Sequence, residues 1–123
     1  MRKFILFAAG LMAAAAILLS TGSAAESKSE LPQDAVEQVI LRLLHQPVKD
    51  AVNDYYDGPR QYWKQEVLSV QKVPQSPYYK VVIRVETFYG PHNPPYGLET
   101  MIFHVGPLDE VRLTNFEHQD EPE

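Results

Sequence analysis

The chain divides into a first part with helical spacing of apolar residues and a second part with strand spacing. Two apolar stripes recur every three or four positions: Val36, Val39, Ile40, Leu43 and Leu44, then Val48, Ala51, Val52, Tyr55 and Tyr56. This spacing places each stripe along one face of an amphipathic helix. Pro47 lies between the stripes and interrupts the helical hydrogen bonds. The pattern therefore predicts a kinked helical segment, or two helices, over about 32–56, with a stop at Asp57-Gly58-Pro59.

From Tyr62 onward the apolar period changes to two, which indicates strands. The clearest strand covers 78–89, and its neighbours cover 62–73, 98–105 and 110–117. In the 98–105 segment both faces are apolar, which indicates a central strand. Helices followed by consecutive strands predict an α+β domain. Its expected architecture is a kinked helical segment packed on one face of a roughly four-stranded antiparallel meander over 62–117.

The segment Gly90 to Gly97 is predicted to form an unusual loop between two of these strands. It contains three prolines together with His92, Asn93 and Tyr96. Both glycines are expected to supply positive φ, and the prolines to stiffen the path. A stiff loop with polar and aromatic side chains loses little entropy on binding. Two interpretations remain open, a recognition loop and a rigid wide turn.

The first 25 residues have the order of a secretory signal peptide. Arg2 and Lys3 precede an uncharged apolar run over 4–19, and Ser23 and Ala25 supply the small residues before a cut at Glu26. The remainder is expected to consist of a disordered arm over 26–31, a single domain over 32–118 and an acidic tail over 119–123. The protein is therefore expected to be secreted after cleavage near Ala25. An alternative is a chain that stays tethered to the membrane by residues 4–19.

Charge and cysteine content narrow the choice of partners. The formal charge is −5, and removal of Arg2 and Lys3 leaves 9 basic against 16 acidic residues, or −7. Such a chain gains nothing from counterion release, so nucleic acid is not an expected partner. Membrane contact is expected only through an uncleaved N-terminal segment. The chain has no cysteine, which excludes disulfides and a lipid-modified N-terminal cysteine. The oligomeric state is left open.

Motifs for catalysis or cofactor binding are missing from the sequence, so no cofactor and no catalytic residue are assigned. Two groups of residues allow either a metal site or a simpler interpretation. His92, His104 and His118 fall near strand ends and could form a zinc triad if these ends met. Four side chains on one helix face could form a weak calcium site: Asp50, Asn53, Asp54 and Asp57. Ordinary surface histidines and a solvated acidic face are the favoured interpretations.

Aromatic side chains give the third functional signal. Tyrosine and tryptophan combine a large contact area with a polar tip, and this suits carbohydrate or peptide surfaces. Tyr96, Tyr62 and Trp63 are expected to be exposed, and with His92 and Asn93 they form the candidate binding residues. The leading hypothesis is a non-enzymatic domain that binds a partner in the cell envelope or medium through the 90–97 loop. The alternatives are a small hydrolase or lyase that uses His92 with a carboxylate such as Glu99, and a purely structural envelope protein.

Three segments carry a resemblance to a known family: Asp54-Tyr-Tyr-Asp-Gly-Pro-Arg-Gln-Tyr62, the run from Phe88 to Phe103, and Phe116-Glu-His118. The chain resembles a family of small exported proteins of spore-forming Gram-positive bacteria of the Bacillus kind, known as domain of unknown function number three-eight-eight-eight. The resemblance covers about 32–118. It implies secretion and one compact domain, and it carries no activity or catalytic residue.

Export is the first testable prediction. Mass spectrometry of culture supernatant is expected to find a chain that begins near Glu26, because the cleavage pattern ends at Ala25. Full-length protein confined to the membrane fraction would instead identify residues 4–19 as an anchor.

Overall fold

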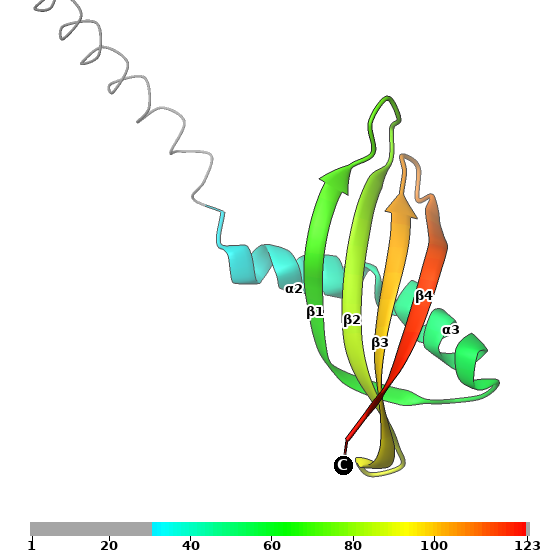
Figure 1. Ribbon diagram of the computed structural model, residues 1–123. Helices are drawn as coiled ribbons and strands as arrows, with labels where there is room; N and C mark the ends of the chain where they lie inside the picture. Colours follow the sequence, from blue (N-terminus) through cyan, green and yellow to red (C-terminus); the bar gives the residue numbers. More distant parts are fainter. Residues whose placement is uncertain (1–30, 123) are drawn as a thin grey trace, which may run out of the picture. The chain divides into compact units, whose positions relative to one another are not determined.

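The computed structural model describes residues 31–122 and shows two helices followed by four strands (Figure 1). The elements are α2 (Gln33–Leu43), α3 (His45–Tyr56), β1 (Gln61–Lys72), β2 (Tyr79–Tyr89), β3 (Asn93–Val105) and β4 (Val111–Glu121). The predicted signal peptide lies outside the described residues. Within 31–122, neither helix has the length and apolar character needed to cross a membrane.

The four strands form one antiparallel sheet in the order β1-β2-β3-β4. Each strand pairs with its neighbour in the sequence, so the sheet is a simple meander. This confirms the predicted α+β class and the four-stranded meander. It also confirms the central position of the 98–105 segment, because β3 is paired on both sides.

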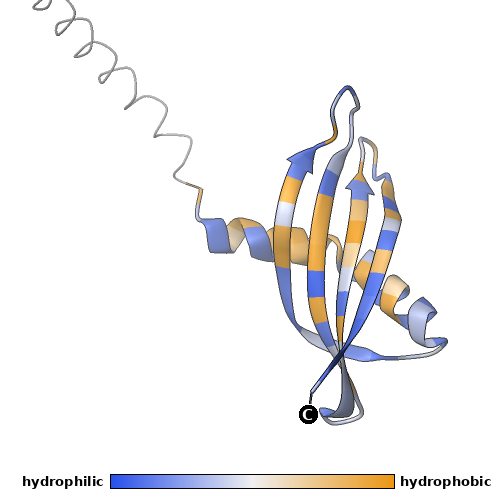
Figure 2. Ribbon diagram, viewed as in Figure 1, coloured by the Kyte–Doolittle hydropathy of each residue, from blue (hydrophilic) through white to orange (hydrophobic). Residues whose placement is uncertain are grey.

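Helix α3 packs on one face of the sheet and encloses the apolar core. Val48, Ala51 and Val52 of α3 contact a buried layer from the two central strands, made of Val81, Ile83, Val85, Met101 and Phe103. The alternation of these strand residues follows the period of two, since every second side chain points to the same face. Figure 2 shows the apolar residues concentrated in the middle of the sheet, whereas the end near the C-terminus is mostly hydrophilic. The core thus leaves one end of the sheet for polar groups.

The first predicted helical stripe needs a correction. Val39 and Leu43 are 55% and 75% exposed, whereas Ile40, Leu41 and Leu44 contact the core. The helical path continues through Leu44, whose amide still donates to the carbonyl of Ile40. The core-facing positions 40, 41, 44, 48, 51 and 52 therefore form one continuous stripe. Periodicity within the first segment could not show which face of α2 meets the core, because two overlapping apolar stripes fit the same residues.

Pro47 has the predicted effect of dividing the helical segment, but the break lies upstream of it. The helices meet at Leu44, and Pro47 occupies the first turn of α3. Proline lacks an N–H, and its ring clashes with the carbonyl four residues earlier, here that of Leu43. Proline is tolerated in the first helical turn, where its amide needs no partner. One proline therefore ends α2 and allows α3 to begin.

The connection between β2 and β3 is shorter than the sequence predicts. Strand β3 begins at Asn93 rather than at Leu98, so only Gly90, Pro91 and His92 lie between the strands. The Pro94–Pro95 peptide bond is cis, and Tyr89 pairs with Asn93. On the other side, β4 runs to Glu121 and pairs with Tyr96. The extra length of β3 comes from these two pairings, and the segment assigned to a loop forms the end of a hairpin.

Strand β1 is an edge strand of the sheet and contacts α2. Its register with β2 shifts between Trp63 and Glu66 and again between Val67 and Ser69. The amide of Val67 donates to the Glu37 carboxylate of α2 at 2.9 Å. Glu37 therefore satisfies one amide in the middle of this edge strand and connects α2 to β1.

Candidate functional site

Three of the candidate binding residues, His92, Asn93 and Tyr96, lie at the end of the β2–β3 hairpin. His92 and Tyr96 make contacts within the hairpin, and Asn93 is exposed. His92 has a positive φ of 63°, and its ring centroid lies 4.2 Å from that of Phe88 and 4.2 Å from that of Trp63. The Tyr96 hydroxyl donates to the carbonyl of His92 at 2.8 Å. Asn93 is exposed and opens β3. His92 and Tyr96 thus hold the hairpin end together while His92 stays accessible.

Trp63 shares an aromatic cluster with Phe88 and His92. Phe88 is 4% exposed, whereas Trp63 is 36% exposed. The Trp63 indole N–H donates to Glu86, and the Lys64 ammonium lies 4.9 Å from the centroid of the Trp63 ring. These contacts fix the orientation of the indole. Trp63, Phe88 and His92 are called the aromatic cluster below.

Tyr62 belongs to a different surface. Strand residues alternate between faces, so Tyr62 points to the helix side and Trp63 to the other side. The Tyr62 hydroxyl lies 2.8 Å from Nδ1 of His45 on α3, and burial raises the pKa of Tyr62. The five candidate residues therefore do not form a single site.

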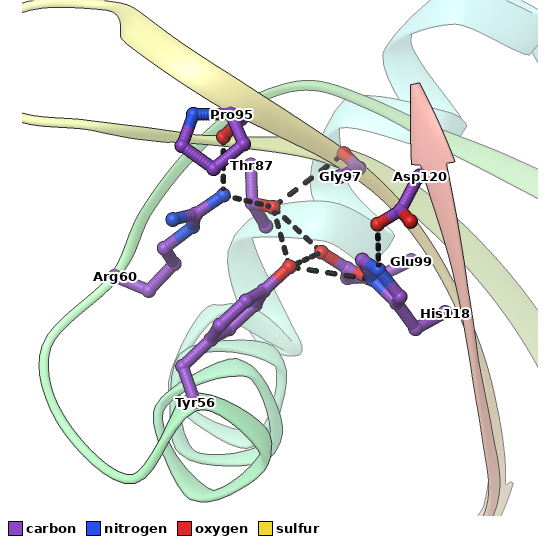
Figure 3. A network of polar contacts seen from close by, with 8 residues as sticks. All are labelled: Tyr56, Arg60, Thr87, Pro95, Gly97, Glu99, His118 and Asp120. Carbon is purple, nitrogen blue, oxygen red and sulfur yellow. Dashed lines mark hydrogen bonds and ion pairs between the residues drawn. The ribbon is translucent and has the colours of Figure 1, made fainter. Parts of the chain in front are cut away.

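The most unusual chemistry in the described residues is a polar cluster beneath the end of α3 (Figure 3). Glu99 is 0% exposed, and its carboxylate accepts hydrogen bonds from the Tyr56 and Thr87 hydroxyls at 2.6 Å each. Nδ1 of His118 pairs with the other carboxylate oxygen. A buried carboxylate without such partners would cost several kcal/mol. Glu99 therefore requires partners from α3, β2 and β4 at once.

Arg60 supplies a second buried charge at the edge of this cluster. Its guanidinium donates to the carbonyl of Pro95 at 2.7 Å and lies 3.4 Å from the Thr87 hydroxyl. The rings of Tyr56 and Tyr89 lie 4.3 and 4.0 Å from its central carbon, which is cation–π distance. The segment between α3 and β1 positions Arg60, because the Arg60 amide donates to the Asn53 side chain at 3.0 Å.

His118 lies between two carboxylates. Nδ1 faces Glu99, and Nε2 lies 2.8 Å from Asp120, whose side chain is 97% exposed. Burial alone would lower the pKa of His118, but the hydrogen bonds to Glu99 and Asp120 and the charges of both carboxylates outweigh it and raise the pKa. The Tyr55 ring stacks at 5.1 Å on one side of the imidazole. The cluster therefore favours the charged form of His118.

Tyr56 acts as a hydrogen-bond donor to Glu99 and not as an acid. Burial, followed by the hydrogen bond to Glu99, raises the pKa of Tyr56 to about 12. At neutral pH its hydroxyl therefore keeps its proton and donates a hydrogen bond to the carboxylate. The end of α3 is thereby attached to β3.

Gly97 makes this arrangement possible, for a reason that differs from the prediction. Its φ is not positive, unlike that of Gly90 at +46°. A Cβ atom at Gly97 would lie 2.5 Å from the Glu99 carboxylate, 2.5 Å from the Tyr56 hydroxyl and 2.7 Å from the Thr87 hydroxyl. Gly97 is therefore required because its hydrogen leaves space for three polar side chains.

The residues considered for metal sites do not converge. His92 precedes β3 and His104 lies near its other end, while His118 is held by Glu99 and Asp120. On α3, Asn53 caps the Arg60 amide, and Asp57 adopts the left-handed conformation that ends the helix. Within 31–122 there is no group of three or more His, Asp or Glu side chains placed to hold a metal ion.

The geometry of the polar cluster does not suit acid–base catalysis. Both ring nitrogens of His118 are engaged by carboxylates, and Glu99 is fully enclosed. A general base must reach a substrate proton within hydrogen-bond distance. The histidine beside Glu99 is His118, and His92 contacts aromatic rings instead. The pairing of His92 with Glu99 that the sequence suggested for a hydrolase is absent from the structure.

The polar cluster is not among the sites predicted from the sequence, although the sequence contains one signal of it. Glu99 stands at an inward position of an apolar strand, between Gly97 and Met101 on the same face. A carboxylate at such a position predicts a buried partner. The identity of the partners depends on strand pairing, since Glu99 lies opposite His118 on β4.

Substitution of Gly97 tests the role of the cluster. Gly97→Ala is expected to lower the free energy of unfolding by at least about 2 kcal/mol, because the methyl group displaces hydrogen-bonded groups around a buried carboxylate. In the double variant Gly97→Ala, Tyr56→Phe, removal of one clashing oxygen is expected to make the combined loss smaller than the sum of the single losses. Urea unfolding of the four proteins measures this coupling. Additive losses would show that Gly97 and Tyr56 act independently.

The raised pKa of His118 predicts a pH dependence of stability. A group whose pKa is higher in the folded state stabilises the fold fully below its unfolded pKa, about 6.5, and this contribution is lost as the pH rises through the folded value. The unfolding free energy is therefore expected to fall above about pH 6.5 in the wild type and to fall less in His118→Gln. His104→Gln, on the other face of the sheet, should keep the wild-type profile. Identical profiles for wild type and His118→Gln would refute the assignment.

A comparison with known protein families identifies the family of this chain. Residues 36–120 match a family described as "Protein of unknown function (DUF3888)". The resemblance inferred from the residues is thereby confirmed, while the bacterial source that it implies stays a prediction. No curated protein and no solved structure matches the chain. Since the match covers most of the sequence, the chain belongs to the family of proteins of unknown function DUF3888.

Proposed function

We propose that this protein is an exported, non-catalytic binding domain that contacts its partner through the end of the β2–β3 hairpin. One observation carries the proposal: the aromatic cluster places the partly exposed ring of Trp63 and the exposed His92 on the buried Phe88. Aromatic side chains that are already oriented lose little entropy on binding. Their flat faces with polar edges suit carbohydrate or peptide ligands.

The contacts of the hairpin support a preformed surface. Glu86 orients the Trp63 indole, and Tyr96 secures the His92 carbonyl. Binding would require little rearrangement, as in many preorganised complexes. The N-terminal pattern of charge, apolar run and small residues supports export, so the proposed partner belongs to the cell envelope or the medium.

The contacts of the histidines favour binding over catalysis. Both ring nitrogens of His118 are hydrogen-bonded to carboxylates, those of Glu99 and Asp120. The described contacts of the His92 ring are with aromatic rings. Nucleophilic catalysis also lacks its usual motifs in the sequence. A binding module requires none of these groups.

The test is a comparison of partner capture by matched variants. Residues 26–123 are immobilised and exposed to wall fragments and culture medium of the producing cells. Wild type is expected to retain a partner that the double variant Trp63→Ala, His92→Ala loses. Tyr79→Ala is the control, because Tyr79 is 48% exposed at the opposite end of β2.

Fluorescence gives an independent readout on the purified protein. Trp63 is the only tryptophan in the chain, so its emission reports directly on the aromatic cluster. Soluble wall fragments that bind there should shift the emission, and the shift should saturate. Equal capture by wild type and the double variant, or capture without any change in emission, would overturn the proposed surface.

A further inference from the structure

A groove runs between the helices and strand β1 and is lined by residues of both. It consists of two cavities of about 360 and 330 Å³ that share His45 and Gln65 in their linings. The first reaches Gln38 on α2, and the second reaches Phe88 on β2. Because the two cavities share these residues, they lie next to each other beside β1.

From this groove we infer a second binding site, whose ligand is an extended acidic peptide segment. The inference is independent of the proposed function, since the groove and the aromatic cluster share only Phe88. Its basis is the charge of the lining, a buried arginine with unused donors, and the edge position of β1.

The lining is basic in an otherwise acidic protein. Arg42, His45 and Lys49 stand at i, i+3 and i+7, which is one face of a helical path, and all three side chains are exposed. Among residues 31–122, no carboxylate belongs to the lining of either cavity. In the part of the chain that the structure describes, the basic partners of ion pairs are Lys64, Arg84, Arg112 and His118, so neither Arg42 nor Lys49 is neutralised. A groove of one sign attracts ligands of the other.

Arg60 provides an independent observation at the same place. It contributes to the lining of the second cavity and is only 6% exposed. Its Nε and Nη1 atoms are buried and have no hydrogen-bond partner in the described residues. Unsatisfied buried donors are costly, and donors of a charged group more so. A shift of the Arg60 side chain toward the groove would let a bound acceptor, such as a carboxylate or a peptide carbonyl, relieve this cost.

The remaining groups favour a peptide over an inorganic polyanion. Gln38, Gln61 and Gln65 also line the groove, and an amide side chain offers both donors and acceptors. A peptide backbone matches both, whereas phosphate at the same site would use only donors. Gln61, Tyr62 and Gln65 of the lining belong to β1, which is an edge strand of the sheet (Figure 1). The amide of Val67 in this strand already bonds a carboxylate, that of Glu37. Extended peptides commonly bind along such edges.

The experiment uses a synthetic peptide in which Glu and Ser alternate, with about ten residues to span the groove at ~3.3 Å per residue. Binding to residues 26–123 is measured by titration calorimetry and by amide chemical shifts at physiological ionic strength. The peptide is expected to bind and to shift the side-chain amides of Gln61 and Gln65. The double variant Arg42→Glu, Lys49→Glu should lose affinity by more than about tenfold, because two attractive charges become repulsive.

Three controls make the result specific. The variant Lys72→Glu, Arg112→Glu has the same net charge but leaves the groove intact, so it should bind like wild type. The matching Gln–Ser peptide should not bind. If the charge-reversed groove variant does not fold, Arg42→Gln, Lys49→Gln replaces it, with a smaller expected loss of affinity.

Several outcomes would overturn the inference. The inference is wrong if the Glu–Ser peptide does not bind, or if the Gln–Ser peptide binds with the same affinity. It is also wrong if both charge-reversed variants lose the same affinity for the Glu–Ser peptide, or if tripolyphosphate binds more tightly than that peptide. Each is distinguishable from failure of the proposed function, because that test reads the aromatic cluster and this one reads the groove.

Discussion

The enclosure of the Glu99 carboxylate constrains the rest of the structure more than any other interaction. A fully buried carboxylate is tolerated only with a complete set of partners. Here the partners are the Tyr56 hydroxyl from α3, the Thr87 hydroxyl from β2 and the His118 imidazole from β4. Because they come from separate elements, the helix and three strands must meet at one point. Gly97 is the residue that leaves room for this meeting.

The apolar core and the polar cluster divide the interface between α3 and the sheet. The core fills the middle, where Val52 and Ile83 are 0% exposed. Apolar contacts stabilise without fixing direction, whereas hydrogen bonds to a buried charge demand one geometry. The core therefore accounts for the attachment of the helix, and the cluster accounts for its position along the sheet. His118 is also the only member of the cluster with a pKa raised from near-neutral values, which makes this position sensitive to pH.

Because the core and the polar cluster fix α3 on the sheet, the outer surfaces of the domain are available for recognition. The aromatic cluster lies at the end of one hairpin, and the basic groove follows the edge strand β1. In the aromatic cluster the side chains are oriented by neighbouring residues, which lowers the entropy cost of binding. In the polar cluster both ring nitrogens of His118 are engaged by carboxylates, whereas His92 is exposed and its ring packs against Trp63 and Phe88.

The sequence by itself determined the class of the fold, because helix and strand periods are local properties. It predicted the helical segment divided near Pro47, the four strands and the central position of the 98–105 segment. Only the tertiary structure decided which helical stripe faces the core, how far β3 extends and why Gly97 is glycine. It also decided that Glu99 meets His118 and Tyr56, which are 19 and 43 residues away. These features depend on contacts between distant segments, and such contacts leave no periodic signal in a single chain.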